Sequence, residues 1–292
     1  RKMKKEIQLI SFDVDGTILN KKGELTNYTL KILGRAAERG IYLVPNTGRS
    51  LSLLSPILNQ IKGISYVSSL NGAVITKLKK EAERKQLWNR DNCLDIERTP
   101  IEKEMLIKIY DLAICCGYSP VFVIDGHYYH AGGRRIFWGI KSETDRVEEL
   151  EEKILTKGIK KVITDSEYSV YKVVLLVPSV NAKKKVLKQL KNISDISVSY
   201  AKPLNIEINA RGVNKGKALE KIARILGVPM ENTMAIGDSD NDVSMMRQAG
   251  IGVAMGNASR SVKRHADQIA RSNEEEGVAR FIEEYMVKRK HE

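Results

Sequence analysis

Cysteine is scarce in this chain of 292 residues. The three cysteines, Cys93, Cys115 and Cys116, do not have the spacing of metal ligands. An odd, sparse set of thiols is typical of a protein that stays in a reducing compartment. We therefore expect a cytoplasmic protein.

Long hydrophobic runs are also absent, and none reaches the length that a membrane-spanning helix needs. The basic residues 1–5 lead directly into a strand-like run, which is not the pattern of a secretory signal. Hydrophobic residues make up 42% of the chain and charged residues 29%, a balance typical of a globular protein. The chain is long enough for two domains, and we expect no membrane partner.

Aromatic residues make up only 6% of the chain and are not interleaved with basic ones. This matters because the net charge of +13 could by itself indicate a nucleic-acid-binding protein. Lysine and arginine are spread along the chain, many of them on predicted helix faces such as residues 183–188, and no nucleic-acid motif is present. We expect a solvated basic surface that also attracts anionic phosphate esters, and no nucleic-acid partner.

Strand and helix patterns alternate over residues 6–75 and again from residue 214, which predicts a parallel sheet in an α/β fold. The alternation of strand and helix patterns stops at residues 77–86, which are charged and resemble a linker. A hairpin turned by Asp125-Gly126 then follows among helices, so we expect an inserted α+β domain. Its expected helices are near 102–116, 143–156 and 181–192, and its expected strands near 120–124, 128–130, 170–177, 196–200 and 205–209.

Two acids, Asp13 and Asp15, follow the first predicted strand, and Gly16 lets the backbone turn after them. In open α/β folds the carboxyl ends of the strands are where ligands bind. One carboxylate can attack an electrophile while the other handles protons, and the pair can hold a divalent cation. The alternative is a turn without chemistry, because Asp and Gly are ordinary turn residues.

Two further clusters have the character of anion sites. Thr47 follows a predicted strand, and Gly48 leaves nearby backbone N–H groups open to a phosphate, although Thr47 could simply cap a helix. Lys215 lies in the first turn of a helix capped by Asn214, where the helix dipole disfavours a cation. An anionic partner would explain this lysine, and a solvated surface position is the alternative.

The last cluster, residues 237–242, combines three acids and an amide at the end of another strand. Helix capping can use one or two of these side chains. So many like charges in one place favour a cation, and a set of oxygen ligands alone favours Mg²⁺.

Taken together, these clusters resemble the motifs of the haloacid dehalogenase superfamily. In order, the four matching segments are residues 12–17 (Phe-Asp-Val-Asp-Gly-Thr), 47–49 (Thr-Gly-Arg), 215–216 (Lys-Gly) and 237–242 (Gly-Asp-Ser-Asp-Asn-Asp). The segments 71–73, 171–173, 215–219 and 252–258 further resemble the Cof-type bacterial phosphatases of that superfamily. The resemblance implies a Rossmann-like core, expected at residues 1–80 and 206–292, and an inserted C2-type cap at 81–205 that sets substrate specificity.

The same resemblance implies how the acids act. Asp13 attacks phosphorus and becomes an aspartyl-phosphate, and Asp15 protonates the leaving alcohol and then activates water. Mg²⁺ is held by Asp13, the main-chain carbonyl of Asp15, and Asp238. Asp242 supports the metal shell or Lys215.

The implied binding residues are Thr47 and Lys215, which hold the phosphoryl oxygens and act in catalysis, with Gly48, Asn71 and Asn241 as further contacts. The expected activity is Mg²⁺-dependent hydrolysis of small phosphorylated metabolites such as sugar phosphates, nucleotide-like esters or pyridoxal phosphate. A phosphotransferase or phosphomutase and a non-catalytic phosphometabolite sensor are the alternatives. The sequence leaves open whether the protein is a monomer or a homodimer.

Specificity would lie in the expected cap, where aromatic and basic side chains surround the hairpin. They either face the active site or pack the sheet of their own domain, and the sequence does not separate the two. These side chains are His127, Tyr128, Tyr129, His130, Arg134, Arg135 and Trp138. No further ligands accompany the histidines, so we expect no zinc site there.

Overall fold

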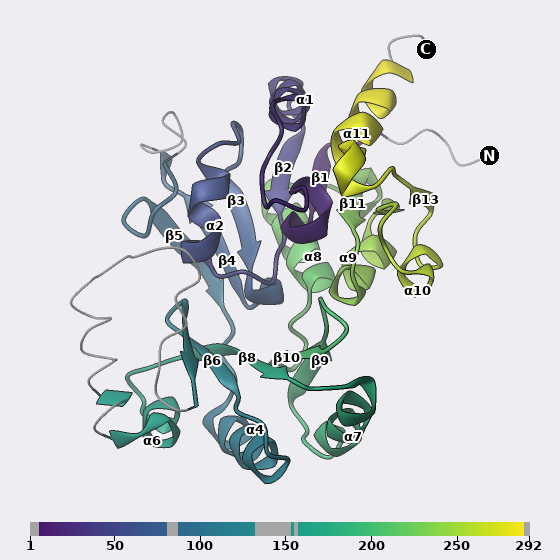
Figure 1. Ribbon diagram of the computed structural model, residues 1–292. Helices are drawn as coiled ribbons and strands as arrows, with labels where there is room; N and C mark the ends of the chain where they lie inside the picture. The colour runs from purple at the N-terminus through teal and green to yellow at the C-terminus, as the bar shows by residue number, and fades with distance from the viewer. Residues whose placement is uncertain (1–5, 81–86, 132–152, 155–156, 289–292) are drawn as a thin grey trace. The chain divides into compact units, whose positions relative to one another are not determined.

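A computed structural model of the chain describes residues 6–80, 87–131, 153, 154 and 157–288 (Figure 1). The chain forms two compact units. The first takes in Arg1–Arg49, Leu54–Glu97 and Asn214–Glu292, and the second takes in Ser50–Leu53 and Arg98–Val213.

The centre of the first unit is a parallel sheet with strand order β13-β12-β11-β1-β2. Its strands are β1 (Leu9–Phe12), β2 (Tyr42–Pro45), β11 (Thr233–Gly237), β12 (Ile251–Ala254) and β13 (Gln268–Ile269). Strand β1 lies between β11 and β2, with Leu9 opposite Thr233 on one side and Tyr42 on the other. The predicted α/β fold with a parallel sheet is confirmed.

Helices pack against this sheet as the apolar patterns predict. They are α1 (Asn27–Glu38), α8 (Lys215–Leu226), α9 (Val243–Gln248), α10 (Arg260–Lys263) and α11 (Gly277–Lys288), whereas the division between the two units passes through α2 (Leu51–Leu58). Helices α1 and α11 lie side by side, as do α8 and α9 (Figure 1). Leu219 and Ile222 of α8 and Met245 of α9 share a buried cluster with Leu9 and Val44 of the strands, so α8 is fixed directly beneath β1 and β2.

Local capping signals start two of these helices. The Thr26 hydroxyl accepts a hydrogen bond from the backbone N–H of Thr29, and the Asn214 side chain accepts one from that of Lys217. Short turns connect other elements: η1 (Val14–Ile18), η2 (Leu70–Gly72), η3 (Met230–Asn232), η4 (Asp240–Asp242) and η5 (Asn273–Glu275).

A three-stranded sheet of order β3-β4-β5 completes the first unit. Its strands are β3 (Tyr66–Ser69), β4 (Val74–Leu78) and β5 (Cys93–Arg98). Strand β5 was not predicted, although Leu94 and Ile96 alternate with acidic residues as in a half-buried strand. In the structure these two apolar side chains are exposed.

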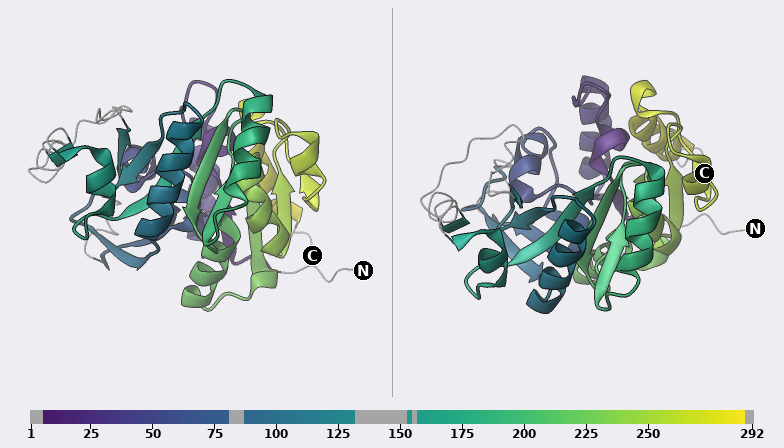
Figure 2. Two further views of the ribbon diagram at one scale, coloured as in Figure 1. Left: turned by 90° about the horizontal axis from the view of Figure 1, so that it is seen from below. Right: turned by 60° about the horizontal axis from the view of Figure 1, so that its bottom comes forward.

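The second unit has an antiparallel sheet of order β7-β6-β8-β10-β9. Its strands are β6 (Val121–Ile124), β7 (His127–His130), β8 (Val170–Leu176), β9 (Ile196–Ser199) and β10 (Asn205–Ala210), and its helices are α4 (Lys103–Cys115), α6 (Ile159–Thr164) and α7 (Val180–Leu190). Helices α4 and α7 lie on one face of this sheet (Figure 2), where Tyr110 of α4 stacks on Phe122 of β6. The predicted hairpin is present, and both Asp125 and Gly126 have positive φ, as its two-residue turn requires.

The bounds of the two units differ from the predicted domain bounds at both ends. Strand β10 pairs with β8 and β9, so residues 206–213 belong with the second unit and not with the first. Strand β5 extends the first unit to Glu97, beyond the predicted limit at residue 80. Most of the helix predicted at 143–156 lies outside the described residues.

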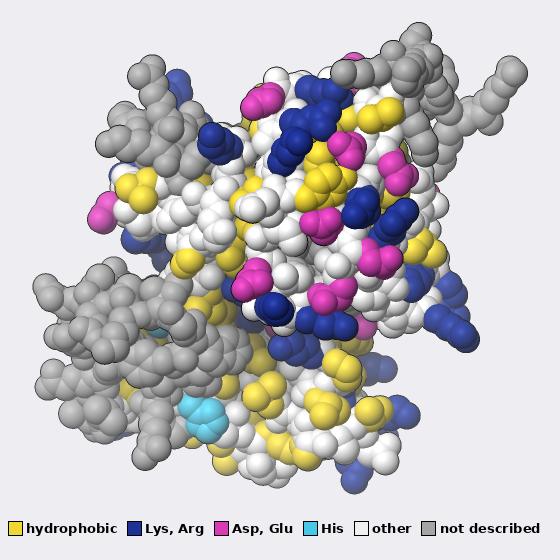
Figure 3. Space-filling view, turned by 45° about the horizontal axis from the view of Figure 1, so that its top comes forward, with side chains coloured by type: hydrophobic (Ala, Val, Ile, Leu, Met, Phe, Trp, Pro, Cys, Tyr) yellow, Lys and Arg dark blue, Asp and Glu magenta, His cyan; other side chains and the backbone are white. Residues whose placement is uncertain are grey.

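Within the described residues, no helix combines the length and the apolar character needed to cross a membrane. On the face shown in Figure 3, lysine and arginine side chains are interspersed with acidic and apolar ones.

Candidate active site

The chain turns sharply after β1, and this turn separates the two acids of the first motif. Asp13 is buried, with its backbone N–H bound to the carbonyl of Ile236 on β11 (3.0 Å), whereas Asp15 is exposed. Gly16 has a φ of +74°, and a Cβ on it would lie 2.7 Å from Oδ2 of Asp238. Glycine therefore allows the turn and the close approach of Asp238 at the same time.

Arg49 binds the side chain of Asp15. Its Nε donates to Oδ2 at 2.7 Å and its Nη2 donates to Oδ1 at 2.5 Å. This is the two-pronged geometry that fits a guanidinium to a carboxylate. The carboxylate of Asp15 is thus held in one orientation, away from the other acids.

Lys215 is fully buried and lies between two carboxylates. Its Nζ donates to Oδ1 of Asp13 and to Oδ1 of Asp242, each at 2.6 Å. Burial is the strongest influence on the lysine and lowers its pKa, but the two carboxylates together outweigh it, so the pKa is raised above the ordinary value. Lys215 therefore carries a positive charge at neutral pH, and the solvated surface position is excluded.

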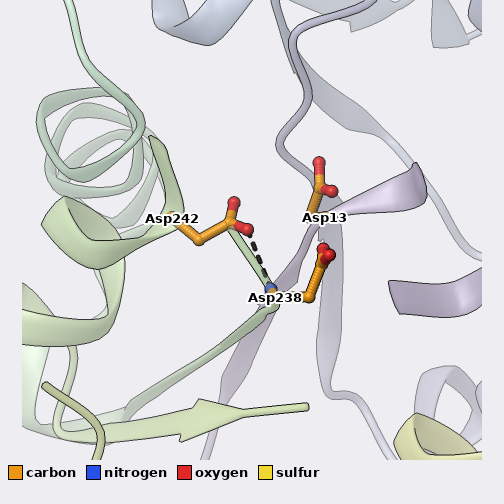
Figure 4. A group of neighbouring side chains, drawn as sticks. All are labelled: Asp13, Asp238 and Asp242. Atoms are coloured by element: carbon orange, nitrogen blue, oxygen red, sulfur yellow. Dashed lines mark hydrogen bonds between the residues drawn. The ribbon is translucent and has the colours of Figure 1, made fainter. Parts of the chain in front are cut away.

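Asp242 uses both carboxylate oxygens within the protein. Oδ1 accepts the hydrogen bond from Lys215, and Oδ2 accepts hydrogen bonds from the backbone N–H groups of Asp238 and Ser239, each at 2.9 Å. Figure 4 shows the bond from Asp242 to the Asp238 backbone. This side chain both caps a turn and restrains the lysine.

Three acids that follow β1 and β11 form a candidate cation site. Asp13, Asp238 and Asp242 each offer one oxygen, and the three oxygens lie within 4.8 Å of one another. When all three are ionised, these acids carry three negative charges, and the positive charge of Lys215 is bonded to two of them. Burial and the nearby Asp242 raise the pKa of Asp238 to about 6.

Burial likewise raises the pKa of Asp13; Lys215 opposes this shift, and the other two acids add to it. With all three acids ionised, an excess of two negative charges among hard oxygen donors fits one Mg²⁺, whose charge would favour the ionised forms. The oxygens of Asp242 accept from the charged Lys215 and from two backbone N–H groups, whereas those of Asp238 accept from the hydroxyls of Thr17 and Ser239, at 3.1 and 3.2 Å. Hydroxyl donors can rotate away, so Asp13 and Asp238 suit the ion as side-chain ligands better than Asp242 does. The Asp15 carboxylate is not part of the cluster, which leaves only its main chain for this role.

The predicted binding residues gather at the neighbouring strand ends. Thr47 is buried after β2, and its hydroxyl accepts from the backbone N–H of Arg49 at 3.2 Å; Gly48 lies in the same loop. Asn71 and Asn241 are buried and joined, Nδ2 of Asn241 donating to Oδ1 of Asn71 at 3.3 Å. The Asn71 backbone N–H also donates to the carbonyl of Thr47 at 2.9 Å, which ties the two loops together.

Hairpin residues of the second unit divide between the two faces of its sheet. Tyr129 is fully buried and is paired with Phe122, so it lies on the face covered by α4. Tyr128 and His130 alternate with it and lie on the opposite face. Arg134, Arg135 and Trp138 lie outside the described residues.

Two residues near the acids were given no role from the sequence. Arg49 was identified as part of a motif but not as the partner of Asp15, although a lone arginine in a loop at an acidic strand end is a usable signal. Asn46 donates from Nδ2 to the carbonyl of Lys215 at 2.8 Å. No local signal in the sequence indicates this bond, because the two residues are far apart in the chain.

The family model described as haloacid dehalogenase-like hydrolase matches residues 10–282. The chain belongs to this family. The family prediction made from the four motifs is therefore confirmed.

Relatives match over nearly the whole chain. A 5-amino-6-(5-phospho-D-ribitylamino)uracil phosphatase of Bacillus subtilis is 29% identical over 97% of both chains. A pyridoxal phosphate phosphatase of Escherichia coli is 26% identical over 96% of this chain and 99% of its own. The structure of a haloacid dehalogenase-like hydrolase from B. subtilis has a TM-score of 0.76 and 25% identity, covering 95% of this chain and 99% of its own.

Proposed function

We propose that this protein is a Mg²⁺-dependent phosphatase that hydrolyses small phosphorylated metabolites through a phosphorylated Asp13. The observation that carries the proposal is the buried Lys215 bridging Asp13 and Asp242, with Asp15 held apart by Arg49. This arrangement separates an oriented nucleophile from an acid/base group two residues later. Relatives named as phosphatases support the same activity.

In the first step, a carboxylate oxygen of Asp13 attacks phosphorus, and the bond from phosphorus to the ester oxygen breaks. Lys215 holds Oδ1 of Asp13, which leaves Oδ2 for the attack. Thr47, Lys215 and Asn241 bind the phosphoryl oxygens, and Gly48 and Asn71 shape the pocket. Because charge spreads over these oxygens in the transition state, fixed donors stabilise it more than they stabilise the substrate.

Asp15 is the proton carrier of both steps. Its carboxyl group gives a proton to the departing alcohol, and its carboxylate then takes a proton from water, which attacks phosphorus and releases phosphate from Asp13. Arg49 orients this carboxylate and must yield one of its hydrogen bonds when Asp15 turns to the substrate.

Mg²⁺ would be held by the carboxylates of Asp13 and Asp238 and the main-chain carbonyl of Asp15, with Asp242 supporting Lys215. When bound, the ion supplies positive charge that lets an anionic carboxylate approach an anionic ester. The chain itself also supplies positive charge, through Lys215, whose raised pKa keeps it protonated.

The substrates we propose are monoesters of the size of sugar phosphates, nucleotide-like esters or pyridoxal phosphate. The two named relatives act on a ribityl phosphate and on pyridoxal phosphate, which brackets this range. We also propose a cytoplasmic location, because the few cysteines are free thiols within the described residues. We further propose that the second unit is a cap domain that selects the substrate.

The test is phosphate release from a panel of phosphorylated metabolites, with Mg²⁺ or EDTA, for the wild type and Asp13→Asn. We expect turnover that requires Mg²⁺ and is lost in the variant. Trapping with a radiolabelled phosphate ester should place the label on the wild-type protein and not on Asp13→Asn. Full activity in Asp13→Asn would show that the nucleophile is assigned wrongly.

Product analysis with an added acceptor sugar separates hydrolysis from transfer. Formation of a phosphorylated acceptor in place of free phosphate would show that the protein is a phosphotransferase and not a phosphatase. Tight binding of a phosphorylated metabolite without turnover would favour the sensor. Asp240→Asn is a matched control, because Asp240 lies in the same acidic segment but is exposed and outside the cluster.

A further inference from the structure

Asn46 joins the backbones on the two sides of the catalytic pair. Its backbone N–H donates to the carbonyl of Phe12, the residue before Asp13, at 2.9 Å. Its side-chain Nδ2 donates to the carbonyl of Lys215 at 2.8 Å. A single residue at the end of β2 therefore links the strand that carries the acid to the helix that carries the lysine.

Two other hydrogen bonds at the start of α8 lead elsewhere. The Asn214 side chain caps the helix itself by accepting from Lys217, and the Gly216 N–H donates to the hydroxyl of Ser244 beside α9. Neither bond connects α8 to the central strands of the sheet. The carboxamide of Asn46 does so, at the residue whose side chain reaches Asp13.

The side chain of Asn46 is buried, and within the described residues only one of the two polar groups of its carboxamide is hydrogen-bonded. It is completely buried, and its Oδ1 has no hydrogen-bond partner among the described residues. Burying an unpaired polar atom is costly, and an apolar side chain of the same size would avoid that cost. The part of the carboxamide that is used is the donor, and its acceptor is Lys215.

We propose that Asn46 is a positioning residue for Lys215, which sets the start of α8 so that Nζ can bind Asp13 and Asp242 together. The inference rests on the proposed phosphatase function. Both bonds of Nζ are 2.6 Å long, so a shift of the helix end toward one acid lengthens the bond to the other. Misplacement of a catalytic group by roughly 1 Å lowers the rate by about 100-fold.

The test uses Asn46→Ala and Asn46→Leu, both of which remove the donor, although only alanine leaves a cavity. Ser68→Ala is the matched control. Ser68 is equally buried, forms a parallel bridge with Asn46, and has a hydroxyl without a partner among the described residues. For each protein we would measure kcat and KM for a phosphate monoester, and the Kd of orthovanadate by calorimetry with Mg²⁺.

We expect both Asn46 variants to bind orthovanadate about 10- to 100-fold more weakly and to lose kcat by a similar factor, while Ser68→Ala matches the wild type. Partial unfolding alone would lower the number of binding sites in calorimetry and leave Kd and KM unchanged, which would overturn the proposal. Wild-type behaviour of Asn46→Leu would also overturn it, since the defect of Asn46→Ala would then come from the cavity.

Failure of the underlying function would look different. A wild type that neither releases phosphate nor binds orthovanadate would overturn the phosphatase and this inference together. A wild type that does both, with Asn46 variants equal to it, would overturn the role of Asn46 alone.

Discussion

Arg49 holds the carboxylate of Asp15 through two hydrogen bonds, of 2.7 Å from Nε and 2.5 Å from Nη2. Lysine at this position keeps the charge but not the planar fork that makes both bonds. We expect Arg49→Lys to lower kcat about tenfold or more with a smaller change in KM, because proton transfer by an oriented group contributes roughly 10²- to 10⁴-fold. Steady-state kinetics on a phosphate monoester would measure this split.

The melting temperature of Arg49→Lys is the control for this prediction. The two side chains are 31% and 54% exposed, and ion pairs of this kind contribute about 0–1 kcal/mol. Arg49→Lys should therefore leave the melting temperature nearly unchanged. A large loss of stability with unaltered kcat would contradict an orienting role for Arg49.

Metal removal gives a second prediction. Because Asp13, Asp238 and Asp242 carry more negative charge than Lys215 balances, Mg²⁺ should raise the melting temperature, and EDTA should abolish turnover reversibly. Asp238→Asn should raise the half-saturating Mg²⁺ concentration by at least about tenfold, and Asp240→Asn should not. Equal Mg²⁺ requirements in the two variants would remove Asp238 from the metal site.

A third prediction concerns the second unit, where Lys172 of β8 and Glu207 of β10 form a buried ion pair at 3.0 Å. The exposed fractions of the two side chains are 4% and 7%. Removing one partner leaves a buried charge, so Lys172→Met should lower the free energy of unfolding by about 3–5 kcal/mol in urea denaturation. The double variant Lys172→Met/Glu207→Leu should recover much of the loss. A double variant as unstable as the single one would argue against an unpaired charge as the cause.

The fourth prediction concerns alkaline pH. Burial raises the pKa of the Cys93 thiol from 9.0 to about 11. A raised pKa in the folded state favours the neutral thiol there, so its contribution to stability is complete below pH 9 and is lost as the pH rises toward 11. Cys93→Ala should flatten the fall of the free energy of unfolding over this range. Cys115→Ala, at an exposed thiol, should leave it unchanged.

Local signals in the sequence were enough to predict much of the fold. The cap at Asn214 and the turn at Asp125-Gly126 depend on residues a few positions apart, and the structure has both. The boundary near residue 206 could not be found in this way. A strand near 205–209 was expected in the inserted domain, yet the predicted bound at 206 cuts through it, and the pairing of Asn205–Ala210 with β8 and β9 assigns the whole strand to the second unit.

The candidate site, like the fold, could be predicted only in part. The motifs bring Asp13 and Asp238 to one place because the carboxyl ends of parallel strands share an edge, and Lys215 reaches Asp13 from the start of α8. The sequence left two roles open for Asp242, and its hydrogen bonds favour the support of Lys215. The partners of Asp15 and Lys215 outside the motifs depend on contacts between distant loops, for which a single sequence carries no pattern.

Thr17 and Asp238 hydrogen-bond across 221 positions of the chain. During synthesis, β1 emerges first and can pair with β2 at once, yet its other edge waits for β11 until most of the protein has been made. An unpaired strand edge of this kind invites aggregation and slows folding. The nascent chain therefore lacks its acidic cluster until β11 and Asp242 have left the ribosome, and its completed central sheet until β13 has done so.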